Sequence, residues 1–247
     1  MLDALYAVPA LTLWVTAGAA FLGGMVRGAA GFGGALVMVP LFAAVSLPAA
    51  AVSLVLLIEC LGYVDMLRHV GRRIAWRAIL QLTSAALVAV PLGVYAVTQF
   101  PATAMTRAIA GCVIASALVL LAGWRYHGAP KLPVTLGVGV VSGVLEGVAG
   151  IPGPPVALFL YGGQQSPQTV RDNLVGYFLV LDLTTLAAFT WQGTITPTLL
   201  WLTAVSLPVS LLGNALGVWL ANKLPDRLLR RSALVLILLA GTSLALR

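Results

Sequence analysis

The sequence predicts an all-α protein that crosses a membrane several times, and three observations lead to this prediction. Hydrophobic residues make up 60% of the 247 residues and charged residues only 9%, whereas a soluble domain carries about 25% charged residues. Apolar stretches of about 20 residues, the length that crosses the hydrocarbon core of a bilayer, recur along the whole chain. No polar stretch is long enough for a separate soluble domain, so we expect one membrane domain.

The charge pattern and the motifs exclude several classes of function. The formal net charge is +7, but the basic residues stand in short loops beside apolar stretches, which is typical of cytoplasmic membrane loops and not of a nucleic-acid-binding surface. Cys60 and Cys112 lie inside apolar stretches, so we expect no disulfide and no thiolate metal site. The sequence contains no HExxH, GxSxG or Walker A motif, so we expect no enzyme, no metal and no cofactor.

Eight apolar stretches predict the helices in chain order. They cover 8–47, 48–67, 77–98, 103–124, 133–163, 170–190, 198–221 and 228–246. Six have the length of a single crossing helix, but a helix over 8–47 would be ~60 Å long, about twice the hydrocarbon thickness. The centres of 8–47 and 133–163 read RGAAGFGG and EGVAGIPGPP, and clustered Gly and Pro weaken helices. We therefore expect both to be broken there, with the break buried in protein or lining a wet cavity.

An internal repeat relates the two halves of the chain. A shift of 119 residues places GMVRGAAGFGG (24–34) over GVLEGVAGIPG (143–153), and four glycines and one alanine coincide. A second shift, of 124 residues, aligns Gly, Pro and Arg positions later in each half. The same order of features over about 110 residues indicates a duplication. We expect an N-terminal repeat over 1–126 and a C-terminal repeat over 127–247.

The distribution of Lys and Arg favours one arrangement of the halves. Apart from Arg27, four crossings per half would place seven basic residues on one side and six on the other. If each long stretch instead returns to the side it entered from, eleven share one side and only Arg107 and Arg247 oppose them, which fits the positive-inside rule. We therefore expect inverted repeats, each with a broken-helix hairpin plus three crossing helices, with parallel repeats as the alternative.

The glycine-rich tips of the two hairpins are candidates for an anion site. The second arm of each hairpin begins at the tip, so its free backbone N–H groups and positive dipole end point inward. The first tip offers the N–H groups of Gly33, Gly34 and Ala35, whereas Pro154 and the proline after it contribute none, which leaves mainly Gly153 and Val156 at the second tip. The alternative is that these glycines only allow close helix packing.

Charged residues within the apolar stretches are further candidates. Arg27 costs at least ~2.5–3.5 kcal/mol in the membrane, so we expect it to face protein or water and to have a partner. Its repeat mate is Glu146, which leaves open an ion pair, an anion held by Arg27, or a proton carried by Glu146. Glu59 and Asp182 could relay protons or only satisfy neighbouring polar groups. Arg171 could draw anions to the cytoplasmic mouth or reach lipid headgroups.

Two runs of sequence resemble a known family. RGAAGFGGALVMVPLF (27–42) and GVLEGVAGIPGPPVALFLY (143–161) are similar to the paired signature of the TauE/SafE sulfite exporters, also called sulfonate uptake permeases. The resemblance covers essentially the whole chain and implies transport of small sulfur-containing anions across a bacterial cytoplasmic membrane. It also implies that the pathway is lined by Gly31, Gly33, Gly34, Gly150 and Gly153. The chain departs from the family pattern at Pro152 and Glu146.

The sequence therefore predicts a secondary transporter of a sulfite- or organosulfonate-like anion in the bacterial inner membrane. A negative-inside potential favours anion export by ~2.3 kcal/mol per charge per 100 mV, so export needs no second ion. Two alternatives remain: a proton-coupled uptake permease, with Glu146 or Glu59 as the proton carrier, and a non-transporting membrane scaffold subunit. The expected partners are the anion, the bilayer and, for uptake, protons; the sequence predicts no particular oligomeric state.

Overall fold

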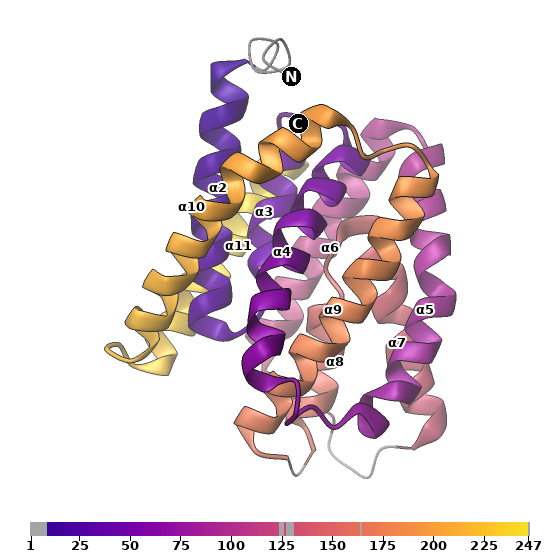
Figure 1. Cartoon of the computed structure of the whole chain (residues 1–247), viewed down its shortest axis with the longest axis vertical. Helices are drawn as coiled ribbons and strands as arrows, with labels where there is room; N and C mark the ends of the chain where they lie inside the picture. Colours follow the sequence, from indigo (N-terminus) through magenta and orange to yellow (C-terminus); the bar gives the residue numbers. More distant parts are fainter. Residues whose placement is uncertain (1–8, 124–125, 127–130, 164, 247) are drawn as a thin grey trace.

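The structure is a computed structural model of the chain and describes residues 9–123, 126, 131–163 and 165–246. Within these residues every regular element is an α-helix (Figure 1). The helices are α2 (Ala10–Ala30), α3 (Gly34–Ala43), α4 (Pro48–Val70), α5 (Trp76–Gln99), α6 (Ala102–Ala122), α7 (Leu132–Ala149), α8 (Gly153–Tyr161), α9 (Pro167–Trp191), α10 (Pro197–Ala221) and α11 (Asp226–Ala245). The expectation of an all-helical protein is confirmed.

Seven helices of the described part of the chain are long and apolar enough to cross a membrane. These are α2, α4, α5, α6, α7, α9 and α10. Helix α3 and the segment 231–245 of α11 are shorter apolar helices. Because a span needs roughly 20 apolar residues, the fold has the composition of a multi-pass membrane protein.

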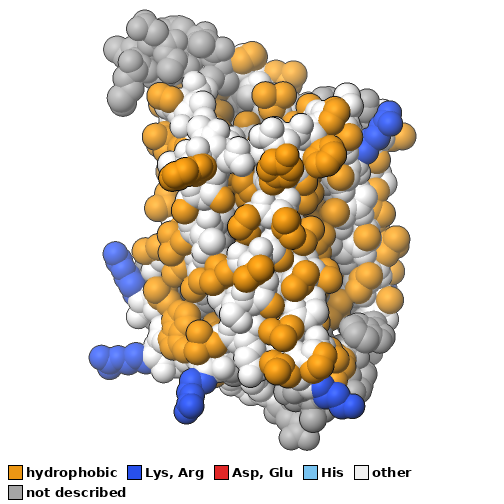
Figure 2. All heavy atoms as spheres, turned by 90° about the vertical axis from the view of Figure 1, so that its right-hand side faces the viewer, with side chains coloured by type: hydrophobic (Ala, Val, Ile, Leu, Met, Phe, Trp, Pro, Cys, Tyr) orange, Lys and Arg blue, Asp and Glu red, His pale blue; other side chains and the backbone are white. Residues whose placement is uncertain are grey.

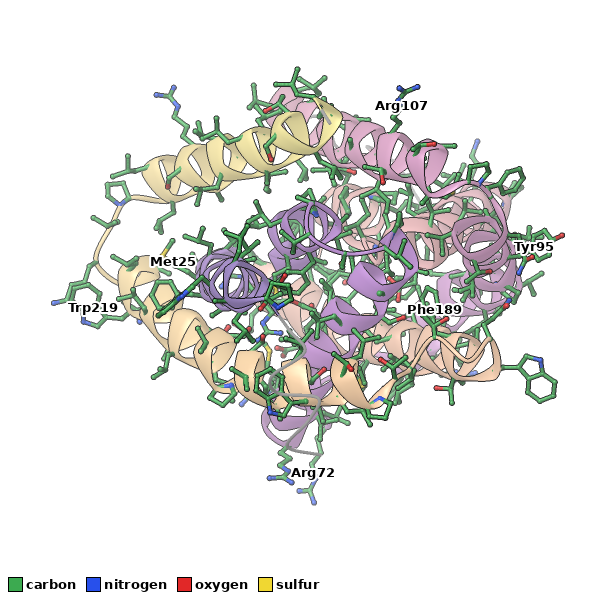
Figure 3. All side chains as sticks on the ribbon, turned by 90° about the horizontal axis from the view of Figure 1, so that it is seen from above. Met25, Arg72, Tyr95, Arg107, Phe189 and Trp219 are labelled. Carbon is green, nitrogen blue, oxygen red and sulfur yellow. The ribbon has the colours of Figure 1, made fainter. Side chains whose placement is uncertain are left out.

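The outer surface of the helix bundle is suited to contact with lipid. Figure 2 shows apolar side chains spread over one face, with basic side chains in its lower half and at one upper corner and no acidic side chain in view. Tyr95, Arg107 and Trp219 point outward from the bundle, whereas Phe189 lies inside it (Figure 3). Exposed Tyr and Trp side chains, such as Tyr95 and Trp219, commonly anchor membrane helices at the headgroup level.

Two helix pairs pack through glycines at very close range. Gly24 and Gly28 of α2 lie against the backbone of Ser210 and Asn214 in α10, and there is no room for a Cβ at either glycine. Such small-residue contacts let two backbones approach in the absence of a hydrophobic driving force. These two glycines, which precede the first tip, are therefore packing residues.

The second close pair is α5 with α7. A Cβ at Gly147 would lie 2.6 Å from the backbone nitrogen of Val94, and Gly93 faces Gly147 across the same contact. Gly143 likewise lies against Ala86. Each of these tight pairs joins one helix from the first half of the chain to one from the second half, so the halves interlock.

The helix ends follow local sequence signals. The Ser166 hydroxyl accepts the N–H of Thr169 at 3.1 Å and caps α9, and the Thr196 hydroxyl accepts the N–H of Leu199 at 3.2 Å and caps α10. Proline occupies the first turn of α4, α7, α8, α9 and α10, where its missing N–H costs nothing. The α4–α5, α8–α9 and α10–α11 junctions lie at the lower end of the bundle, and the α3–α4, α5–α6 and α9–α10 junctions at the upper end (Figure 1).

The close packing of α5 on α7 predicts a sharp contrast between two glycines of α7. We expect Gly147→Ala to destabilise the protein by about 1–3 kcal/mol, because its Cβ meets backbone atoms that cannot rotate away. Gly137 has nothing within 4 Å of the Cβ position, so Gly137→Ala should be neutral or stabilising by about 0.5–1 kcal/mol. Thermal unfolding of the detergent-purified variants checks this, and equal melting temperatures would contradict it.

Candidate functional site

Helices α2 and α3 form a tight hairpin whose tip is residues 31–33. Gly31 and Gly33 have φ of 83° and 90°, a left-handed conformation that favours glycine. The N–H of Gly31 donates to the carbonyl of Arg27 at 2.7 Å and closes the end of α2. A Cβ at Gly34 would lie 3.3 Å from the Cβ of Arg27 and 2.9 Å from the carbonyl of Gly23. Helix α3 therefore runs back along α2.

Helices α7 and α8 meet at a second tip, which α9 holds in place. Gly150 has φ of 63° and donates its N–H to the carbonyl of Glu146 at 2.7 Å. The Ser142 hydroxyl donates to the carbonyl of Pro152 at 2.8 Å, and the Tyr177 hydroxyl donates to Ser142 at 2.8 Å. A carbonyl freed by the break thus receives a hydrogen bond inside the protein, as a low-dielectric environment requires. The Ser142–Tyr177 pair was not found from the sequence.

A small cavity lies where the two tips meet. Its volume is about 30 Å³, which is room for about one water molecule. The lining residues are Phe32, Gly33, Ala35 and Leu36 from the first tip, Gly150, Ile151, Pro152, Gly153 and Pro154 from the second, and Glu59, Tyr63, Phe178 and Asp182 from α4 and α9. Aromatic rings fill much of the space, since a Cβ at Gly153 would lie 3.3 Å from Phe32 and 3.4 Å from Phe178.

Arg27 is held beside this cavity by α4. It is only 2% exposed, its Nη1 lies 3.4 Å from Oε2 of Glu59, and its guanidinium carbon lies 5.7 Å from the centre of the Tyr63 ring. Gly62 makes room for the guanidinium, because a Cβ there would lie 2.7 Å from Nη1. An ion pair and an aromatic face both favour a buried guanidinium.

The ion pair that the sequence suggested between Arg27 and Glu146 does not form. Glu146 projects from α7 toward α9, where it lies within interaction range of Asp182 and Thr185. The partner of Arg27 is Glu59, on α4. The repeat relates Arg27 to Glu146 because the two occupy equivalent positions in the halves. Contact depends instead on which helices pack together, and α4 brings Glu59 to Arg27.

Acidic groups outnumber basic ones in this buried cluster. Glu59, Glu146 and Asp182 are 4%, 0% and 3% exposed. Both oxygens of Glu146, Oε1 of Glu59 and Oδ2 of Asp182 receive no hydrogen bond from any described residue. Three carboxylates and the one guanidinium of Arg27 would sum to −2 if all were ionised. A buried unpaired carboxylate is costly, so the cluster has a capacity for added positive charge.

The other predicted site residues lie around the cavity in different ways. Gly33, Ala35, Gly150, Gly153 and Glu59 line it. Gly34 packs against Glu59, and Gly31 faces away from the cavity, toward Arg171. Arg171 itself is exposed at the start of α9. Its Cγ would lie 3.5 Å from a Cβ at Gly31, so Arg171 stands outside the first tip.

The sequence assigned no role to the aromatic residues of the cavity, and it left the role of Asp182 open between a proton relay and a structural one. Phe32, Tyr63 and Phe178 supply aromatic walls and Asp182 supplies a carboxylate. A usable signal was present, because the 119-residue shift that pairs Arg27 with Glu146 also pairs Tyr63 with Asp182. The described side chains form no group of three or more His, Cys, Asp or Glu that could hold a metal ion.

Comparison with known proteins gives one match. A family model described as sulfite exporter TauE/SafE matches residues 16–244, a range that includes both tips and the whole charged cluster. Searches among curated proteins and among solved structures find no match. The resemblance read from the two glycine-rich runs is confirmed.

The charged cluster predicts opposite effects for two isosteric changes. Glu59→Gln removes the counter-ion of buried Arg27, so we expect it to lower stability by about 3–5 kcal/mol. Glu146→Gln replaces a carboxylate that receives no described hydrogen bond, so we expect stability to stay level or rise. Thermal unfolding of both variants in one detergent tests this. A larger loss in Glu146→Gln than in Glu59→Gln would refute the assignment of the ion pair.

Proposed function

The chain belongs to the sulfite exporter TauE/SafE family, and from this premise we propose that it is a secondary transporter of a small sulfur-containing or organic anion. Seven helices of crossing length together with the family make it a multi-pass membrane protein. The observation that carries the proposal is the meeting of two helix breaks at a buried cavity between α4 and α9. Broken helices that meet inside a bundle are how many secondary transporters build a substrate site.

The first tip is the better anion donor in this proposal. Gly33 and Ala35 line the cavity, and the opening N–H groups of α3 have no acceptor within their own helix. The positive end of the α3 dipole lies at the same place and favours a negative charge. Pro154 and Pro155 deprive the start of α8 of two N–H groups. The substrate anion would therefore bind closer to Gly33 than to Gly153.

We further propose that the halves are inverted repeats, 1–126 and 127–247. The order of one long helix, one short helix and three long helices occurs twice. The close pair of α2 with α10 has its counterpart in α7 with α5, as a two-fold relation between the halves would produce. Positions separated by 119 residues also converge at the charged cluster: Arg27 with Glu146, Glu59 with Phe178, and Tyr63 with Asp182.

We take the lower end of the bundle in Figure 1 as cytoplasmic, and the membrane as the bacterial inner membrane. Arg72, Arg171 and Lys223 belong to helix ends and junctions at that end, whereas Arg107 lies near the start of α6 at the other end. Arg247 lies outside the described residues. An excess of Lys and Arg marks cytoplasmic loops, so α2 would enter from the outside and α7 from the cytoplasm.

Proton-coupled anion uptake is the second candidate, and the composition of the cluster favours it over simple export. An anion that enters beside three carboxylates and one arginine meets net negative charge unless the carboxylates bind protons. Glu146 and Asp182 lie within interaction range of each other, so one proton taken up by the pair would relieve repulsion both within it and toward the substrate. Proton and anion would then bind together. No similar observation among the described residues supports the alternative of a non-transporting scaffold subunit.

The transport proposal predicts that two strained glycines differ in function. Gly33 and Gly193 both have positive φ, but only Gly33 lines the cavity. Alanine at either position costs roughly 1–2 kcal/mol of backbone strain. We expect Gly33→Ala to reduce sulfite or methanesulfonate flux in proteoliposomes at least tenfold, and Gly193→Ala to leave it within twofold of wild type. Equal flux in the two variants would remove the first tip from the substrate pathway.

Proton coupling predicts a specific defect in Glu146→Gln. In proteoliposomes without an anion gradient, we expect an inward proton gradient to drive anion accumulation by the wild type. Glu146→Gln should lose this accumulation and keep downhill anion flux, since a carboxamide cannot exchange a proton. Anion flux and internal pH are recorded together. If the anion flux of the wild type does not depend on the pH gradient, the result would favour export driven by the membrane potential instead.

A further inference from the structure

A second and much larger pocket adjoins the cavity between the tips. Its volume is about 320 Å³, and its walls come from the ends of α2, α6 and α8 and the first half of α11. Phe32, Gly33 and Leu36 line both spaces. The pocket therefore lies directly outside the first tip, on the side of the bundle that we take as cytoplasmic, and we call it the vestibule.

The lining of the vestibule combines an apolar wall with one positive charge. Its other described lining residues are Val26, Ala29, Ala30, Leu120, Ala157, Leu158, Tyr161, Leu229, Ala233, Leu234 and Ile237. Arg171 is the charged residue among those that the structure describes here. The stem of Arg171 rests on Gly31, with Cγ and Cδ 3.5 and 3.6 Å from a Cβ placed there. Contact with the first tip thus holds the guanidinium at the pocket.

Arg171 is available to a ligand. The structure pairs Arg27 with Glu59 but records no carboxylate partner for Arg171 among the side chains that it describes. A planar guanidinium can bind two oxygens of an anionic headgroup at once. Charge complementarity therefore selects an anion for this pocket, and the aliphatic wall selects an apolar body attached to it.

The size of the vestibule argues against a bare oxyanion as its ligand. A volume of about 320 Å³ equals roughly ten water molecules and reaches the lower end of the range of small-molecule sites. Sulfite, with four heavy atoms, would leave most of the apolar wall in contact with water. An organic anion with a compact hydrocarbon body would cover that wall.

We infer that the vestibule is a distinct binding site for an amphipathic organic anion, with Arg171 binding its headgroup and the α8–α11 wall its apolar body. The inference rests on the proposed transport function and deepens it. The ligand would bind in the vestibule first, and its headgroup would then pass Phe32 to reach the tip cavity. Phe32 lies 3.3 Å from the Cβ position of Gly153 and lines both spaces. A ligand that moves from the vestibule to the second tip would therefore pass this ring.

A homologous series of ligands tests the site directly. Binding of methanesulfonate, butanesulfonate and hexanesulfonate to the protein in phosphatidylcholine nanodiscs is measured by calorimetry, with empty nanodiscs as the blank. We expect affinity to rise up to about fourfold per methylene as the chain covers the wall. Hexanol, which lacks the charge, should bind much more weakly than hexanesulfonate. An affinity that does not change with chain length would overturn the inference.

Two pairs of variants separate the headgroup from the wall. Arg171→Gln should weaken hexanesulfonate about tenfold or more, whereas Arg231→Gln, an exposed arginine of α11 outside the pocket lining, should bind like the wild type. Ala233→Leu fills the pocket and should abolish the chain-length dependence, whereas Ala204→Leu on the outer face of α10 should not. Equal weakening by both arginine variants would assign the effect to general surface charge and overturn the site.

The remaining controls distinguish other occupants and other failures. Nanodiscs that contain phosphatidylglycerol should give the same sulfonate affinity, and its loss would identify the vestibule as a site for anionic lipid instead. If the wild type transports neither sulfite nor any of the sulfonates while the sulfonates still bind with the expected pattern, the transport proposal fails and the binding site stands.

Discussion

The constraint on which the structure depends is that lipid offers no hydrogen-bond partner to a broken helix. Gly31 to Gly33 and Gly150 to Pro152 interrupt two apolar stretches, so both breaks have to be enclosed by protein. The enclosure comes from α4 and α9, which pass beside the tips, and from the close glycine contacts that fix α2 on α10 and α7 on α5. The place where lipid is excluded is therefore also the place where backbone N–H groups and buried charge gather. The proposed transport site and the stability of the two breaks would therefore depend on the same enclosure.

The buried charges follow from the same enclosure. Arg27 could not remain in a lipid-facing position at an acceptable cost, and Glu59 and the ring of Tyr63 supply its environment. Both oxygens of Glu146 and Oδ2 of Asp182 receive no hydrogen bond from the described residues. A protein that only needed to be stable would gain from replacing them by apolar residues, since buried ionic groups rarely repay their desolvation. Their presence beside the tips is thus better explained by a task that uses their charge than by structure alone.

The sequence predicted the parts of the fold that depend on local chemistry. Apolar runs placed the spans to within a few residues, and the clustered glycines and prolines stand where α2 and α7 end, near residues 30 and 149. It did not assign the glycines of one motif to different roles, because Gly24 and Gly28 differ from Gly31 and Gly33 only in which helix lies beside them. The prediction of Glu146 as a partner of Arg27 was wrong for the same reason. Contacts between helices distant in the chain are set by packing geometry, which composition and spacing do not encode.

The two cavities have opposite characters, and the difference bears on how a substrate would be chosen. The space between the tips has room for about one water molecule, with backbone groups and carboxylates on its walls, so an anionic headgroup could enter it only after it widens, and an apolar body has no room there. The vestibule has room for such a body but only Arg171 as a charged lining residue in the described part of the chain. Because Phe32 lines both spaces, a ligand bound in the vestibule by Arg171 and the apolar wall would pass this ring before its headgroup reaches the tip cavity. Selectivity among anions with a common headgroup would then come from the vestibule, and the energetic coupling from the carboxylates beyond it.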